Sequence, residues 1–386
     1  MADDLVKQPI HWISTVEELE ECCERWQSKK LLAVDTEFMR SQTYYPIAGL
    51  IQVNDGEANY LLDPTTIDDF SPFAEILVDD DIIKAIHSCS EDLEVFYHSF
   101  GFLPQRLFDT QIAGAFVNLG YSMGFARMVQ GVLGVELPKT ETRSDWLQRP
   151  LSVAQKHYAA LDVEYLYLLA GKLLTELKAK ERLDWVFGEG KTIVKNFSDN
   201  LDPKLSYLRA KNAWKLNAKQ LAIFQNLCEW RELTAQKRDK PRNRIVKENT
   251  LFAMALKRPK HISQLRNYEG MSDRVIRTDG EYLLRLIERA DKIEASDLPE
   301  LLPKPLTSAE NKRVKALRAE VQKVADEIGI ASEILARKKE YDYIVRDYLA
   351  RGEWSYPEGF PQWRQALLTD LINETIKVEP ADEVDS

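Results

Sequence analysis

The sequence predicts an α/β unit at the N-terminal end of the chain, followed by units made only of helices. Short apolar runs rich in β-branched residues alternate with helical periodicity up to about residue 200, as in an α/β fold. Only helical periodicity follows over 216–290, with breaks at Pro241 and Gly270. A Pro-bearing stretch, 298–313, leads into a further helical segment, and 386 residues are enough for two or three domains.

The strands and helices expected in the first unit follow from the hydrophobic pattern. Four apolar runs predict strands: LLAVDTEF (31–38), GLIQVND (49–55), NYLLDP (59–64) and DIIKAIHS (81–88). Four stretches of helical periodicity predict helices: 16–27, 90–100, 109–118 and 152–174. Thr15, with Glu18 three residues later, predicts a capping box at the start of the first helix. Ser90 is the expected N-cap of the second helix.

Domain limits are expected where the periodicity breaks. The stretch GEGKTIVKNFSDNLDP (188–203) is predicted to interrupt the helical pattern and to end the first unit. The chain is therefore expected to divide into residues 1–200, 208–292 and 300–378, with an acidic disordered tail at 379–386.

The net charge of −10 conflicts at first sight with a nucleic-acid partner, because cations supply most of the affinity for phosphates. The charge is unevenly distributed, however. Residues 1–171 hold 12 Lys and Arg against 27 Asp and Glu, residues 172–299 hold 27 against 18, and residues 300–386 hold 13 against 17. We therefore expect cation binding in the first region and phosphate contact in the second. The acidic balance of the third indicates a packing or shaping role.

Composition also bears on the compartment. No run approaches the roughly 20 apolar residues of a membrane-spanning helix, and the acidic start MADDLVKQPI lacks the apolar core of a signal peptide. The four cysteines have neither zinc-ligand spacing nor the pattern of a disulfide framework. The chain is expected to act in the reducing cytoplasm without membrane contact. It is expected to be a monomer, since three units in series would already surround a substrate.

Two carboxylates share one face of the strand predicted over 31–38. Residues i and i+2 of a strand point the same way, so Asp35 and Glu37 lie together and Thr36 lies on the other face. Carboxylates this close in a buried strand repel each other unless a cation neutralises them. Mg²⁺ and Mn²⁺ prefer such oxygen ligands, and nucleases hold two of these ions about 3.5–4 Å apart. A solvated or salt-bridged pair is the alternative interpretation.

Two further segments supply residues that can join this pair. Asp92 follows His87 by five residues and falls in the first turn of a predicted helix, near a strand end where open α/β sheets place their sites. Tyr158 and Asp162 lie four residues apart on a long predicted helix and so share a face. Because a phenol has an ordinary pKa of about 10, Tyr158 is expected to position the attacking water rather than to deprotonate it.

These residues, in this order, resemble the three motifs of the DEDD exonuclease superfamily in its tyrosine-bearing branch. The motifs are D-T-E at 35–37, H-x4-D at 87–92 and Y-x3-D at 158–162. Longer stretches resemble the bacterial ribonuclease D family: VDTEFMRSQTYYPIAGLIQV (34–53), KAIHSCSEDLEVF (84–96), FDTQIAGAF (108–116), TRSDWLQRPLS (142–152) and YAALDVEYL (158–166). The resemblance implies an RNase H-like (DnaQ-like) α/β exonuclease fold with a mixed sheet flanked by helices. It further implies that two divalent metal ions, Mg²⁺ or Mn²⁺, are bound by Asp35, Glu37, Asp92 and Asp162, with Tyr158 as the water-orienting residue.

The helical units resemble domains of the helicase-and-RNase-D C-terminal (HRDC) type. The match in 208–292 lies at 230–251 and 257–271, and a weaker match in 300–378 lies at 324–349 and 360–372. Residues 231–277 contain 13 Lys and Arg against 5 Asp and Glu. A solvated charged face is the simpler interpretation of such a run, but this domain type often binds nucleic acid. The predicted phosphate contacts, which position a substrate without reading its bases, are Lys237, Arg238, Lys240, Arg242, Arg244 and Lys247.

The resemblance implies a metal-dependent, hydrolytic 3′→5′ exoribonuclease that releases nucleoside 5′-monophosphates. Its implied partners are RNAs with a free 3′ end, namely tRNA precursors and other small structured RNAs. Candidates for contact with the 3′ nucleotide are Phe38, Tyr44, Gln52 and Trp146, although core packing is the expected role of the aromatic ones. Three alternatives stay open: the same chemistry on DNA, a non-catalytic RNA-binding scaffold, and helical units that mainly bind protein partners.

Overall fold

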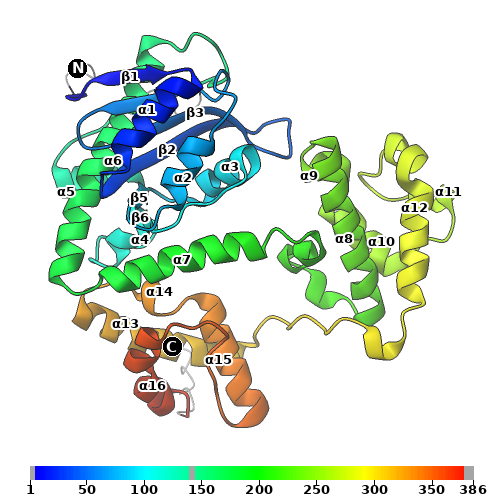
Figure 1. Cartoon of the computed structure of the whole chain (residues 1–386). Coiled ribbons are helices and arrows are strands. Elements are labelled where there is room, and N and C mark those ends of the chain that lie inside the picture. The colour runs from blue at the N-terminus through cyan, green and yellow to red at the C-terminus, as the bar shows by residue number, and fades with distance from the viewer. Residues whose placement is uncertain (1–4, 139–143, 378–386) are drawn as a thin grey trace.

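The structure is a computed structural model that describes residues 5–138 and 144–377. An α/β unit, coloured blue to green in Figure 1, carries two helical units, one green to yellow and one orange to red. This is the order that the sequence predicts, an α/β unit with a mixed sheet followed by all-helical units. The tail expected at 379–386 lies outside the described residues.

The α/β unit contains six strands and seven α-helices within the described residues. In chain order they are β1 (Ile10–Ile13), α1 (Val16–Trp26), β2 (Leu31–Met39), β3 (Ile47–Asn54), β4 (Asn59–Leu62), α2 (Ser71–Val78), β5 (Ile83–Ile86), α3 (Ser90–Phe100), β6 (Leu107–Asp109), α4 (Thr110–Ala115), α5 (Phe125–Leu133), α6 (Val153–Ala179) and α7 (Leu183–Asp199). The four predicted strands and four predicted helices are all confirmed. Strands β1 and β6 and helices α2, α5 and α7 were not anticipated.

The strands form one mixed sheet in the order β1-β4-β3-β2-β5-β6. Strand β3 runs antiparallel to β2 and β4, whereas the β1–β4, β2–β5 and β5–β6 pairs are parallel. Strand β2 is central, and its apolar residues divide between two cores. Leu32 and Val34 pack with α1, α2 and α3 on one face, and Ala33 packs against α6 on the other. The face of β2 that meets α6 is therefore the face of Asp35 and Glu37.

The segment 188–199 corrects one prediction. It was expected to interrupt the helical pattern, but it forms the C-terminal half of α7. Gly190 allows α7 to pack closely on the sheet, because a Cβ added there would lie 2.4 Å from the carbonyl oxygen of Leu107 in β6. The glycine therefore serves a close helix–strand contact and does not end the helix.

Two helical units follow α7, and the first begins after two short 3₁₀ turns. Its helices are α8 (Ala218–Arg238), α9 (Arg242–Ile245), α10 (Glu248–Lys257), α11 (Ile262–Leu265) and α12 (Asp273–Asp291). The second unit contains α13 (Ser308–Ile328), α14 (Ser332–Leu335), α15 (Lys338–Arg351) and α16 (Gln362–Thr375). No helix in the described part of the chain is long and apolar enough to span a membrane.

The two helical units join the α/β unit in different ways. The second unit shares one continuous hydrophobic core with α4, α6 and α7, in which Trp185 stacks on Trp363 with ring centroids 4.2 Å apart. The first unit has a separate core, and the α/β unit contributes only the loop after β2, through Tyr44 and Tyr45. Figure 1 shows this loop reaching towards the first unit while the second lies against α7.

Candidate active site

Three carboxylates meet where the central strand faces the long helix. Asp35 and Glu37 come from β2, and Asp162 comes from α6. Their ligand oxygens all lie within 4.8 Å of one another, and each side chain is partly buried. Helix α6 is fixed over the sheet by a capping box between Ser152 and Gln155 and by its apolar contacts with β2, β3 and β4. The predicted convergence of these three residues is thus present in the structure.

Asp92 lies next to this cluster but outside the 4.8 Å group. It is 6% exposed in the first turn of α3, and its Oδ1 accepts a 2.6 Å hydrogen bond from the hydroxyl of Thr36. Thr36 points away from Asp35 and Glu37, as the strand alternation predicts, so Asp92 approaches β2 from the opposite face. Asp35 is the carboxylate whose charge contributes most to raising the pKa of Asp92 after burial itself. The charge of Asp92 in turn contributes to raising the pKa of Glu37, so Asp92 is electrostatically part of the same acidic group.

The start of α3 differs from the prediction in its cap. The N-cap residue is Cys89 rather than Ser90, and it makes no side-chain capping bond. Instead the carboxylate of Asp109, at the end of β6, accepts hydrogen bonds from the backbone N–H groups of Ser88 and Cys89, at 3.2 and 3.0 Å. Asp109, twenty residues after Cys89, thus stabilises the turn that positions Asp92. The local sequence offered Ser90 as the obvious cap because it could not show this tertiary contact.

Tyr158 lies one turn before Asp162 on α6, beside the indole of Trp146 with ring centroids 6.2 Å apart. The backbone that carries Trp146 passes so close to β3 that a Cβ at Gly49 would lie 2.8 Å from the Trp146 Cβ. Arg149 fastens the same segment by donating to the carbonyl of Gly49 at 2.6 Å and to the carboxylate of Asp63. The register of the β2–β3 pair shifts between Glu37 and Phe38, directly opposite this glycine.

The electrostatics of the cluster are those of carboxylates lacking a counter-ion. Burial and the charge of Asp162 raise the pKa of Asp35 to about 7, and burial raises that of Asp162 to about 7. Burial and the three neighbouring carboxylates raise the pKa of Glu37 to about 10. Among the described residues, none of the four carboxylates forms a salt bridge. The repulsion is therefore uncompensated by the protein itself.

This donor set fits a divalent cation. Hard ions such as Mg²⁺, Mn²⁺ and Ca²⁺ take carboxylate oxygens, and three of them within 4.8 Å can share one ion. An ion would also relieve the repulsion that, with burial, raises the pKa values of Asp35 and Glu37. Tyr158 behaves differently, because burial and the nearby carboxylates raise its pKa far above the usual range and keep the phenol protonated.

The four residues suggested for contact with the 3′ nucleotide differ in burial and in their contacts. Trp146 is 3% exposed in a small core, and Tyr44 is 9% exposed with its hydroxyl bonded to Glu232. Gln52 pairs with Asp35 across the sheet and is fully buried, and neither polar atom of its amide has a partner among the described residues. Only Phe38 keeps partial exposure. The expected packing role of Tyr44 and Trp146 is confirmed.

The six basic residues singled out in the first helical unit divide into two groups. Arg238 donates two hydrogen bonds to Asp279, at 2.8 and 2.9 Å, and Arg242 forms a bidentate pair with Glu232. These two guanidinium groups are already neutralised within the protein. The remaining four are exposed and form no ion pair with a described residue: Lys237, Lys240, Arg244 and Lys247.

The fold and the acidic cluster define a 3′–5′ exonuclease. The family model for a 3′-5′ exonuclease matches residues 10–178, and the model for an HRDC domain matches residues 220–287. The matched exonuclease region contains all four carboxylates and Tyr158.

Comparison with known proteins narrows this class to one family. Ribonuclease D of Pseudomonas paraeruginosa is 42% identical over 370 residues, which cover 94% of this chain and 97% of the relative. Ribonuclease D of Escherichia coli is 36% identical over 373 residues, covering 95% and 98%. The crystal structure of the Escherichia coli enzyme superimposes with a TM-score of 0.87 over 97% of this chain and all of that one. The chain belongs to the ribonuclease D family and is a 3′→5′ exoribonuclease, of a type that uses divalent metal.

Proposed function

We propose that Asp35, Glu37, Asp92 and Asp162 hold two divalent ions, Mg²⁺ or Mn²⁺, and that Tyr158 positions the attacking water. The observation that carries this proposal is the cluster of Asp35, Glu37 and Asp162, whose oxygens lie within 4.8 Å without a protein cation. Asp35 is the natural shared ligand, because it neighbours both this cluster and Asp92. When bound, such ions supply charge stabilisation for phosphodiester cleavage and make water more acidic at neutral pH.

The reaction proposed at this site is hydrolysis of the terminal phosphodiester. Water adds to phosphorus, the bond from phosphorus to the 3′ oxygen of the preceding nucleotide breaks, and a nucleoside 5′-monophosphate leaves. The shortened RNA keeps a 3′ hydroxyl and is ready for another cycle. The phenol of Tyr158 stays protonated at neutral pH, so it can donate a hydrogen bond that orients the water but is a poor base.

Structured RNA with a free 3′ end is the proposed substrate, with tRNA precursors and other small RNAs as the physiological class. The Escherichia coli relative is described as an exoribonuclease involved in structured RNA processing, which supports this choice. We assign phosphate contact to the four exposed cations of the first helical unit, Lys237, Lys240, Arg244 and Lys247. Arg238 and Arg242 are reassigned to the ion pairs in which they already take part.

The proposed organisation is a monomer with units at 1–200, 208–292 and 300–378. The first helical unit has its own hydrophobic core, which supports the limits 208 and 292. The second helical unit shares its core with the α/β unit, so residues 300–378 form a separate segment of the chain but not a separately packed unit. Four buried free thiols, Cys22, Cys23, Cys89 and Cys228, support action in the reducing cytoplasm.

The proposal is tested by a time course on a 5′-labelled tRNA that carries a few extra 3′ nucleotides, with Mg²⁺, with Mn²⁺ and with a chelator. We expect a ladder that shortens one nucleotide at a time only when metal is present and stalls near the mature end. A matched DNA strand, run in parallel, should be cut more slowly, because an RNA-processing enzyme is expected to contact the 2′ hydroxyl. Metal-independent shortening would contradict the site assignment, and equal rates on DNA would contradict the substrate class.

A further inference from the structure

The second helical unit repeats the first at a constant distance along the chain. Helices α13, α14 and α15 begin 90 residues after α8, α9 and α10, respectively. Helices α8 and α13 also have equal length, both begin with a capping box, and both end at a left-handed residue, Asp239 and Gly329. Positions 90 residues apart can therefore be compared directly at the corner where the three helices meet.

In the first unit this corner is partly filled by a loop of the α/β unit, and one of its two carboxylates is paired with an arginine. The loop after β2 lies against it and inserts Tyr44, whose hydroxyl donates to Glu232 at 2.5 Å. Glu232 also accepts both hydrogen bonds from Arg242, and the Arg242 guanidinium lies 4.7 Å from the centre of the Tyr44 ring. A second carboxylate, Glu248, lines the same corner.

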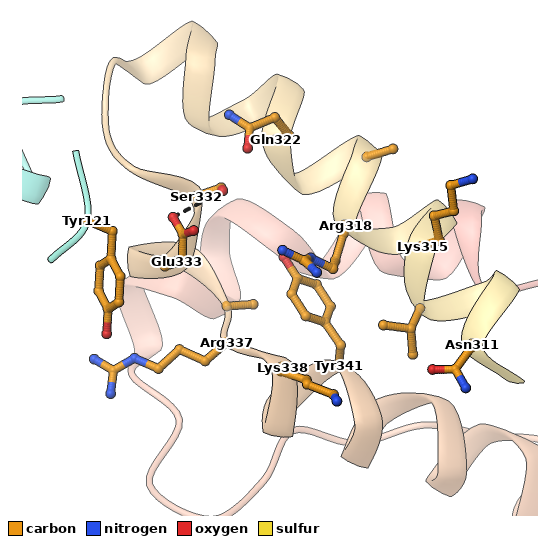
Figure 2. A pocket seen from close by; sticks show the side chains of 13 residues that line it. Tyr121, Asn311, Lys315, Arg318, Gln322, Ser332, Glu333, Arg337, Lys338 and Tyr341 are labelled. Carbon is orange, nitrogen blue, oxygen red and sulfur yellow. Dashed lines mark hydrogen bonds between the residues drawn. The ribbon is translucent and has the colours of Figure 1, made fainter. Parts of the chain in front are cut away.

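In the second unit the same corner is a larger hollow with an excess of cations. Gln322 stands 90 residues after Glu232, and Lys338 stands 90 residues after Glu248, so a neutral amide and a cation replace the two carboxylates. Ser332 stands 90 residues after Arg242, so the cation that pairs with Glu232 in the first unit is also replaced. These three residues line a cavity of about 770 Å³. The polar and aromatic residues around it, labelled in Figure 2, are Tyr121, Asn311, Lys315, Arg318, Gln322, Ser332, Glu333, Arg337, Lys338 and Tyr341.

The hollow has four cations and one carboxylate. The cations are Lys315, Arg318, Arg337 and Lys338, and the carboxylate is Glu333, which accepts a hydrogen bond from Ser332 at 3.4 Å. Arg337 also forms an ion pair with Glu189, 3.4 Å away. Arg318 and Lys338 are exposed and form no ion pair with a described residue. Because residues 300–386 as a whole carry more acidic than basic residues, this excess is a local feature of the corner.

Two tyrosines complete the hollow. Tyr121 comes from the loop between α4 and α5 of the exonuclease unit and is 36% exposed, and the guanidinium of Arg337 lies 6.0 Å from the centre of its ring. Figure 2 shows the Arg318 guanidinium beside the phenol of Tyr341 on the floor of the hollow. Guanidinium groups bind phosphates through paired donors, and an exposed aromatic ring gives a base or ribose a surface to stack on.

We propose that this hollow binds the phosphodiester backbone of structured RNA, as a contact site separate from the basic patch of the first unit. The inference rests on the chain acting on structured RNA, and it gives the second helical unit a direct part in holding the substrate. Arg318 and Lys338 of the second helical unit supply the charge. Tyr121 belongs to the α/β unit, so the proposed contact site includes residues of both units. An RNA too short to reach the hollow gains nothing from it.

The test compares two charge-neutralised pairs in the full-length protein. Arg318→Gln/Lys338→Gln removes two cations of the hollow and keeps their aliphatic stems. Lys304→Gln/Lys339→Gln removes two exposed cations of the same unit that do not line it. Binding to a folded tRNA is measured in chelator, so that no hydrolysis occurs, at several salt concentrations. Hydrolysis of a short single-stranded oligonucleotide is measured with metal.

The hollow variant should bind the tRNA about tenfold more weakly, and the slope of its log affinity against log salt should fall by about 2, one for each lost phosphate contact. The control pair should stay within about twofold of the parent, as expected for exposed cations outside the binding site. Both variants should hydrolyse the short oligonucleotide normally, and Arg318→Lys/Lys338→Arg should restore tRNA binding. Equal tRNA affinity for the hollow and control pairs would overturn the proposal, whether or not hydrolysis is observed. A charge-restored variant that still binds weakly would do so as well.

Discussion

Two groups of buried carboxylates in this protein have opposite surroundings. Asp35, Glu37 and Asp162 crowd within 4.8 Å and form no salt bridge with a described residue. Glu189 of α7, with a side chain 4% exposed, is enclosed by the guanidinium groups of Arg364 and Arg337 from the second helical unit. The protein neutralises carboxylates of the second kind, here called the completed group, with its own arginines. Those of the first kind need a cation from solution.

Glu232 belongs with the completed group. Burial alone would raise the pKa of this carboxyl, but hydrogen bonds from Arg242 and Tyr44 hold it below its usual range. It lies 4% exposed at the joint between the first helical unit and the loop that follows the catalytic strand. Carboxylates paired with arginine thus hold the units together, whereas the unpaired ones gather at the site.

The largest expected effect comes from removing an unpaired carboxylate. Asp162→Asn should lower kcat for RNA hydrolysis by about 1,000-fold or more, since a bound ion supplies several kcal/mol to the transition state. The metal-free variant should be at least as stable as the parent, because one repelling charge is gone. The measurements are kcat with saturating Mg²⁺ and the metal-free Tm. Glu176→Gln, on the exposed side of the same helix, is the control. Near-normal turnover in Asp162→Asn would show that the unpaired carboxylates are not needed for hydrolysis.

A stability loss should follow from breaking a completed pair. Arg364→Ala leaves Glu189 buried with only part of its counter-charge, and loss of one partner of a buried ion pair costs about 3–5 kcal/mol. Urea unfolding is followed by tryptophan fluorescence, to which the stacked Trp185 and Trp363 of this joint contribute. The folded fraction should still hydrolyse a short oligonucleotide. Arg351→Ala, which breaks an exposed pair in the same unit, should cost less than about 1 kcal/mol.

A smaller effect is expected at the first helical unit. Tyr44→Phe deletes the hydroxyl that donates to Glu232 and accepts from Arg242 and Gln236, a loss of about 1–2 kcal/mol in docking of this unit. Hydrolysis of structured RNA should slow by about fivefold, the equivalent of 1 kcal/mol. A short oligonucleotide should be unaffected. Tyr45→Phe is the matched control, because Tyr45 forms hydrogen bonds to described residues through its backbone N–H and carbonyl but not through its hydroxyl. Equal behaviour of the two variants would exclude a role for the Tyr44 hydroxyl.

A further effect is a pH dependence of the metal-free protein. The pKa values of Asp35 and Asp162 rise from an unfolded value near 4 to about 7 in the folded chain, so folding favours their protonated forms. Their contribution to stability is complete below about pH 4 and is lost as the pH rises through about 7. The metal-free Tm should therefore fall between pH 5 and pH 8, and Mg²⁺ should raise it more at pH 8. Asp35→Asn/Asp162→Asn should flatten this trend. The prediction would be contradicted if the metal-free Tm of the parent changed with pH in the same way as that of the double variant.

The site residues could be named in advance because their spacing is local. Alternation along β2 puts Asp35 and Glu37 on one face, and the helical repeat puts Tyr158 and Asp162 on one side of α6. The capping box of Thr15 and Glu18 is also present as predicted. Elements that were missed had too few residues to show a period, such as the three-residue β6, or relied on contacts with other elements, as α7 does.

The sequence by itself determined the order of an α/β unit and helical units, the motif residues, and the separation of acidic from basic regions, because these depend on residue type and short-range periodicity. The tertiary structure decided which charges are paired. Arg242 is close to Glu232 in the chain, but it is Tyr44, 188 residues before Glu232, that completes their joint. Glu189 meets Arg364 across 175 residues, and Asp109, at the end of the neighbouring strand β6, accepts hydrogen bonds from the turn before Asp92. Burial and counter-charge arise only when distant segments pack, and they separate a structural carboxylate from one that awaits a metal ion.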